Sequence, residues 1–223
     1  LKSSAFDLAF VIAQGASAGT TVSGTLAVAE RAGIRVFATG GIGGVHRGAA
    51  DSFDISHDLQ SLARSRVVTV CAGAKAILDL PKTLEYLETA GVCVVGYQTS
   101  SFPAFYSRDS GLRLDYSAES ADVIARAFVA REQLGLPGGI LVAAPIPVEY
   151  EIPADQIGAS IDLAIAQAAE CGVQGKDVTP FLLASLARIT AGRSVEANLA
   201  LLENNARVGA RIAEAIGALA PAL

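Results

Sequence analysis

The fold is decided by residues 34–48, which read IRVFATGGIGGVHRG. The first six of these, residues 34–39, form a short run rich in branched side chains. Glycines follow at once, as is typical of a buried strand that ends in a tight turn. Three further runs of this kind lie at residues 66–71, 92–97 and 139–144. The sequence therefore predicts four buried strands.

Segments with the apolar spacing of helices lie between these strands, so strand and helix alternate along the chain. This alternation predicts an α/β fold in which helices cover a mixed or parallel β-sheet. After Pro153 the pattern is wholly helical, and we expect this C-terminal part to pack on the sheet or on a neighbouring subunit. We expect one domain over residues 1–223. The predicted helices span residues 20–32, 74–80, 82–90, 118–134, 154–171, 179–190 and 194–219.

The composition narrows the class of protein. Of 223 residues, 52% are apolar and 17% are charged, which argues against disorder and favours an oligomer. The net charge of −5 gives no general attraction to a nucleic-acid backbone, so we exclude a nucleic acid polymer as partner. No apolar run spans a bilayer and no signal peptide is visible. Three cysteines without CxxC spacing fit a reducing compartment, so we expect a soluble, cytoplasmic protein with no membrane partner.

The glycine-rich turn at residues 39–48 is the first candidate site. Its glycines allow backbone amides to approach an anion that a Cβ would keep away. It matches neither a Walker A loop nor a GxGxxG turn. Two interpretations remain open, a phosphate or substrate loop and a purely structural turn. His46 within it could bind substrate or could be satisfied by nearby backbone.

Carboxylates follow the glycine-rich turn. Asp51, Asp54 and Asp58 offer hard oxygen ligands of the kind that magnesium and manganese prefer. Their spacing alone does not decide in favour of a metal, because Asp58 could cap the helix that follows and Asp54 could be a solvated loop carboxylate.

Lys75 is the second candidate. It is the one cation in residues 67–79, a segment that runs from a buried strand through a turn of small residues. Desolvation there should lower the pKa of the amine, and a neutral amine can attack a carbonyl to form a Schiff base. The alternative is that Lys75 extends into water from the first turn of a helix.

Taken together, these motifs resemble the signature of the pseudouridine-5′-phosphate glycosidases, also called the indigoidine synthase A family. The resemblance rests first on residues 36–48, 53–56 and 71–75. It continues through residues 102–106, 175–183 and 197–201, and so covers essentially the whole chain.

The resemblance implies a reversible cleavage of the carbon–carbon glycosidic bond of pseudouridine 5′-phosphate into uracil and ribose 5-phosphate. It also implies Mn²⁺ or another divalent cation as cofactor, and a homotrimer. Lys75 would be the nucleophile that attacks C1′ of the ring-opened sugar and forms a Schiff base, and Asp54 would bind the metal. The residues expected to bind substrate are Lys2, Val22, His46, Ser56, His57, Asp58 and Asn198.

The chain departs from the family pattern in three respects that bear on function. An N-terminal segment with a proton-donor glutamate has no counterpart here, and because residue 1 is not methionine we expect that a preceding portion has been lost. His57 stands where alanine is usual, either as an additional ligand for metal or substrate or as a tolerated substitution. Phe6 replaces a typical arginine near Lys2.

Two other functions therefore stay open. The first is a Schiff-base lyase or aldolase that acts on another phosphosugar, which would keep Lys75 and the glycine-rich turn. The second is a truncated remnant that binds sugar phosphates without activity.

Overall fold

The computed structural model describes residues 1–173 and 178–219, and its centre is a five-stranded sheet in which all strand pairs are parallel. The strand order is β3-β4-β7-β5-β6. The α/β prediction is thus confirmed, with a parallel main sheet. Its strands are β3 (Val36–Ala38), β4 (Val68–Cys71), β5 (Cys93–Tyr97), β6 (Tyr116–Ala118) and β7 (Ile140–Ala143).

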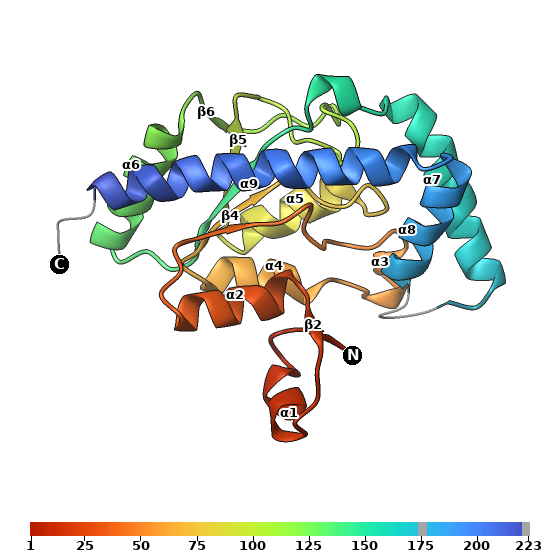
Figure 1. Cartoon of the computed structure of the whole chain (residues 1–223), viewed down its shortest axis with the longest axis horizontal. Coiled ribbons are helices and arrows are strands. Elements are labelled where there is room, and N and C mark those ends of the chain that lie inside the picture. The colour runs from red at the N-terminus through yellow and green to blue at the C-terminus, as the bar shows by residue number, and fades with distance from the viewer. Residues whose placement is uncertain (174–177, 220–223) are drawn as a thin grey trace.

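Helices cover both faces of the sheet, as Figure 1 shows. The long helix α9 crosses the molecule, α7 and α8 lie at its N-terminal end, and α1 projects from the body. A two-stranded parallel pair, β1 (Lys2–Ser3) with β2 (Gly19–Thr20), flanks α1. The α-helices are α1 (Leu8–Ala13), α2 (Val22–Arg31), α3 (Ala49–Ser52), α4 (His57–Arg64), α5 (Leu80–Thr89), α6 (Ala121–Gln133), α7 (Ala154–Glu170), α8 (Val178–Ile189) and α9 (Arg193–Leu219), and a 3-10 helix, η1, spans Val148–Tyr150.

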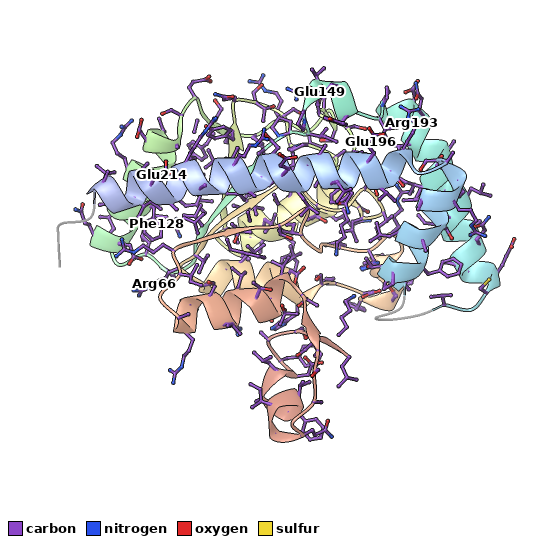
Figure 2. All side chains as sticks on the ribbon, in the orientation of Figure 1. Arg66, Phe128, Glu149, Arg193, Glu196 and Glu214 are labelled. Carbon is purple, nitrogen blue, oxygen red and sulfur yellow. The ribbon has the colours of Figure 1, made fainter. Side chains whose placement is uncertain are left out.

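The apolar runs are continuous because the central strands are buried on both faces. In β7, Ile140 and Val142 join the cluster formed with α6 and α9, whereas Leu141 and Ala143 join the cluster on the opposite face. Phe128 on α6, labelled in Figure 2, packs into the first of these clusters. Within the described residues, no helix has both the length and the apolar character needed to cross a bilayer.

The C-terminal part is helical, as predicted, and α9 packs directly against β3 and β4. The helix predicted at residues 74–80 is wrong, because this segment pairs with the glycine-rich turn through bridges at Ala74 and Leu78. The next helix, α5, starts at Leu80, where Asp79 accepts a hydrogen bond from the Lys82 amide as its N-cap. Local helical spacing was overridden by tertiary pairing.

Candidate active site

Two loops meet at the carboxyl edge of the parallel sheet, where α/β proteins bind ligands. The glycine-rich turn leaves β3 and the loop that carries Lys75 leaves the adjacent β4. Their backbones are joined by hydrogen bonds from the Ala72 amide to the Gly40 carbonyl at 2.8 Å, and from the Lys75 amide to the Ile42 carbonyl at 3.1 Å. The glycine-rich turn therefore fixes the backbone of Lys75.

Two glycines of this turn are required by close packing. A Cβ on Gly41 would lie 2.6 Å from the ring of Phe105, and a Cβ on Gly43 would lie 2.2 Å from Ser56 Oγ. Phe105 itself is buried and has a left-handed backbone with φ of 66°, which is uncommon outside glycine. The structural interpretation of these glycines is supported, and anion binding by the turn stays a prediction.

Asp58 joins the turn to helix α2. Its carboxylate is buried and accepts hydrogen bonds from the Ser23 amide at 2.9 Å and from the Gly43 amide at 2.8 Å. The N-cap of α4 is Ser56, whose hydroxyl accepts from the Asp58 amide, so the capping role considered for Asp58 is wrong. Both oxygens of Asp58 are engaged by backbone, which makes this carboxylate a support of the site wall.

His46 and Asp54 form a pair across two short antiparallel segments. The His46 amide donates to the Asp54 carbonyl at 3.0 Å, and His46 Nδ1 lies 3.8 Å from Asp54 Oδ2. Burial lowers the pKa of His46, opposed by the charge of Asp54 and assisted by Lys75 and Lys2. A lowered pKa favours the neutral imidazole near neutral pH.

Lys75 has the electrostatics of a nucleophilic amine. Burial lowers its pKa, Asp58 opposes this shift because a nearby carboxylate favours the ammonium, and Lys2 adds to it. The residues around Lys75 form no helix, so its extension into water from a first helical turn is wrong. The side chain instead faces a cavity of about 680 Å³.

This cavity brings together all nine residues to which the family resemblance gives a role as nucleophile, metal ligand or substrate-binding residue. They come from strands, helices and loops that are far apart in the chain. Asp51, the third carboxylate of its cluster, lies in α3 and does not line the cavity. The nine are Lys2, Val22, His46, Asp54, Ser56, His57, Asp58, Lys75 and Asn198.

The sequence did not single out Phe105 or Asn205. Phe105 lines the cavity beside Gly41, but nothing in its local sequence signals a left-handed backbone. Asn205 is fully buried on α9 and donates from Nδ2 to the Thr39 carbonyl at 2.8 Å and to the Gly40 carbonyl at 3.3 Å. The seven-residue spacing from Asn198, two helical turns, was the available signal for Asn205.

The described residues contain no cluster of three or more His, Cys, Asp or Glu side chains that could hold a metal ion. The carboxylate of Asp54 is half exposed in the cavity, with His46 beside it. Mg²⁺ and similar hard ions commonly bind through one or two carboxylates and take their other ligands from water and substrate. The arrangement fits such an ion and does not fit a cage made of protein ligands alone.

Comparisons with known proteins identify the family of this chain. The sequence profile described as indigoidine synthase A like protein matches residues 1–215. The chain is 56% identical over 213 residues to the pseudouridine-5′-phosphate glycosidase of Caldanaerobacter subterraneus subsp. tengcongensis, covering 96% of this chain and 69% of that protein. It is 56% identical over 216 residues to the same-named protein of Methylobacterium nodulans, covering 97% and 64%. The chain thus spans about two thirds of the length of these relatives.

Two solved structures share the fold. The prealnumycin C-glycosynthase AlnA, in complex with ribulose 5-phosphate, superimposes with a TM-score of 0.91 at 40% identity, covering 98% of this chain and 72% of AlnA. An indigoidine synthase A-like protein from Thermotoga maritima gives a TM-score of 0.89 at 41% identity, covering 96% of this chain and 70% of that one. With the profile match and these identities, the chain belongs to the family of indigoidine synthase A like proteins.

Proposed function

We propose that this chain carries the active site of a pseudouridine-5′-phosphate glycosidase, which joins and separates uracil and ribose 5-phosphate through an imine on Lys75. The observation that carries the proposal is the amine of Lys75, its pKa lowered by burial, in a cavity with the eight other residues to which the resemblance gives a role. Two named relatives and the C-glycosynthase AlnA support the choice of a carbon-linked glycoside.

The bond to be cleaved explains the need for an amine. Uracil linked through carbon has no glycosidic oxygen or nitrogen to protonate, so a two-carboxylate mechanism is a poor fit. The sugar ring opens as the C1′–O4′ bond breaks and O4′ takes up a proton, and Lys75 Nζ bonds to C1′ and loses a proton. The nitrogen lone pair then forms C=N while the C1′–C5 bond breaks, its electrons pass to uracil, and C5 takes up a proton. Water hydrolyses the imine and releases ribose 5-phosphate.

The two ends of the substrate have different partners in the proposal. Lys2 and the backbone at Val22, in the first turn of α2, receive the phosphate, since helix N-termini carry amides that point at anions. Ser56 and His57 belong to the same end. Asn198 on α9 offers an amide to the edge of uracil.

Asp54 holds Mn²⁺ or another divalent cation in this proposal. The ion, when bound, neutralises anionic oxygens of the substrate. Asp54 supplies the protein oxygen because its carboxylate lines the cavity, and His46 lies beside that carboxylate.

We further propose a homotrimer in the cytoplasm. The arm formed by residues 1–20 exposes Phe6, Phe10 and Ile12, and burying such apolar side chains favours association. The free cysteines Cys71, Cys93 and Cys171 fit a reducing compartment. Light scattering coupled to size exclusion tests the trimer directly, and a monomer at micromolar concentration contradicts it.

The decisive experiment is borohydride trapping with ribose 5-phosphate, followed by peptide mass mapping. We expect a sugar adduct on the peptide that contains Lys75, absent from Lys75→Ala and retained by Lys82→Ala, whose lysine pairs with Asp79 outside the cavity. An adduct elsewhere, or none in a folded protein with metal, contradicts the proposal and favours a binding remnant.

A second measurement identifies the base. Ribose 5-phosphate is incubated with and without uracil, and the product is read by NMR. Pseudouridine 5′-phosphate should form only when uracil is present. Trapping of the sugar without any C-glycoside product would favour a Schiff-base lyase or aldolase of another phosphosugar.

A further inference from the structure

Phe6 and His57 meet in the wall of the cavity although they are far apart in the sequence. Their rings are edge to face, with centroids 5.7 Å apart and an interplanar angle of 85°. Phe6 comes from the N-terminal arm and is 67% exposed, whereas His57 is the first residue of α4. Both also line a neighbouring cavity of about 400 Å³, so this pair separates the two spaces.

Hydrogen bonds fix this contact from both sides. The Ala5 amide donates to Ser23 Oγ at 3.2 Å, and the Ser23 amide donates to Asp58 Oδ1 at 2.9 Å. Phe6 follows Ala5 and His57 precedes Asp58 in the chain. Each ring therefore extends from a backbone that is anchored to the first turn of α2.

The imidazole ring of His57 can donate a hydrogen bond in the cavity wall. Among residues 1–173 and 178–219, its ring nitrogens have no hydrogen-bond partner, and its one ring contact is with Phe6. An imidazole offers one N–H donor when neutral and two when charged. The nearby carboxylate of Asp58 is occupied by two backbone amides and does not hold the imidazole.

We propose that His57 is a specificity-determining residue that donates a hydrogen bond to the phosphate of a phosphorylated pentose, and that Phe6 is a positioning residue that orients the His57 ring. The proposal rests on the proposed function for the sugar-phosphate site. The edge-to-face contact restrains the plane of the His57 ring, and His57 lines the same cavity as Lys2 and the first turn of α2.

The proposal predicts discrimination between two sugars. Half-saturating concentrations are measured for imine trapping at Lys75 with ribose 5-phosphate and with ribose. His57→Ala should raise the value for ribose 5-phosphate about 10-fold, as expected for one hydrogen bond to a charged group, and should leave that for ribose unchanged. His57→Gln, which keeps an N–H donor, should recover part of the loss. Equal shifts for both sugars, or no shift for either, overturn the proposal.

The role of Phe6 is tested by a double-mutant cycle. Phe6→Leu alone should raise the half-saturating concentration of ribose 5-phosphate about 3-fold, but should have no further effect in the His57→Ala background. Phe10→Leu is the matched control, because Phe10 is also exposed on the arm yet does not line the cavity. Additive effects of Phe6→Leu and His57→Ala would show that Phe6 acts on its own.

Histidine NMR separates this proposal from the chemistry at Lys75. The chain has only two histidines, so His57→Ala assigns both imidazole signals. Ribose 5-phosphate should shift the His57 signal in Lys75→Ala, which forms no imine, and ribose should not. If no imine forms on Lys75 but ribose 5-phosphate still shifts the His57 signal, the proposed function is contradicted and the role of His57 is not. Absence of the shift in the folded protein sinks the role of His57.

Discussion

The side-chain amide of Asn205 donates a hydrogen bond of 2.8 Å to the carbonyl oxygen of Thr39, at the point where β3 passes into the glycine-rich turn. The same nitrogen reaches the Gly40 carbonyl, while the buried Oδ1 has no hydrogen-bond partner within the described residues. One amide on α9 therefore satisfies the Thr39 carbonyl and adds a second, longer hydrogen bond to the Gly40 carbonyl, which already accepts from the Ala72 amide.

Asn205 should be essential for stability. Asn205→Leu removes the donor to the Thr39 carbonyl, whereas the Gly40 carbonyl keeps its bond from the Ala72 amide, and the change should lower the free energy of unfolding by about 1–3 kcal/mol. Asn205→Asp buries a charge against carbonyl oxygens and should cost more, about 3–5 kcal/mol. Asn204→Ala, which loses a bond to the Pro145 carbonyl, should cost about 1 kcal/mol or less. Urea unfolding measures all three, and equal stability of Asn205→Asp and the unchanged protein would contradict the role.

The reactivity of Lys75 should depend on pH in a way that its neighbours control. Because burial and Lys2 lower its pKa, reductive methylation by formaldehyde should show a midpoint below the ordinary value of 10.5. Lys2→Gln removes a positive charge and should raise this midpoint, whereas Asp58→Asn removes the opposing carboxylate and should lower it. Mass spectrometry of the Lys75 peptide gives the midpoint, and unfolded protein gives the reference.

The lowered pKa of Lys75 also makes the free energy of unfolding depend on pH. Between the lowered pKa of folded Lys75 and its ordinary value of 10.5, the unfolded chain binds more protons than the folded one. The free energy of unfolding should therefore rise with pH across this window. Lys75→Met should flatten that rise, as measured by urea unfolding at a series of pH values. An unchanged slope would show that the amine is solvated.

Glycine substitutions should have opposite effects at two positions. Gly43→Ala places a Cβ 2.2 Å from Ser56 Oγ and 2.7 Å from Asp58 Oδ2, so it should cost about 1–3 kcal/mol. Gly158→Ala, in α7 with open space around the new Cβ, should stabilise the protein by about 0.5–1 kcal/mol. Thermal unfolding compares the two variants. If Gly43→Ala left the free energy of unfolding unchanged, Ser56 and Asp58 would have to move aside without strain.

Metal binding at Asp54 should be visible without catalysis. Mn²⁺ is paramagnetic and should broaden the imidazole signal of His46, whose Nδ1 lies 3.8 Å from the Asp54 carboxylate. A chelator should restore the signal, and Asp54→Asn should prevent the broadening. Asp51→Asn is the control, because Asp51 lies outside the cavity. Broadening that survives Asp54→Asn would place the ion elsewhere.

The sequence predicted the sheet well because buried parallel strands are read as unbroken apolar runs, such as that around Val68 and Val142. It missed β6, a short edge strand whose Tyr116 is exposed. It also misplaced a helix over residues 74–80, because the pairing partner of this segment is a turn some thirty residues earlier in the chain. Local patterns do not contain that information.

The same limit applies to the site. Lys75, His46 and the carboxylates could be named as candidates because each residue type signals chemistry where it stands, but their roles were assigned by the family resemblance. For Asn205 the sequence offered only its spacing from Asn198, since its partner Thr39 lies 166 positions away and the bond exists only after α9 docks on the sheet. Phe105 could not be identified, because its role depends on the glycine against which it packs.

Strand β7 lies between β4 and β5, both of which precede it in the chain. During translation, β4 and β5 leave the ribosome before β7, the strand with which both of them pair. At about 5–20 residues per second, the interval from residue 97 to residue 140 lasts about 2–9 s. During that time the valine-rich edges of β4 and β5 lack the strand that joins them. We therefore expect nascent chains of this protein to need chaperones most in the interval between the synthesis of β5 and that of β7.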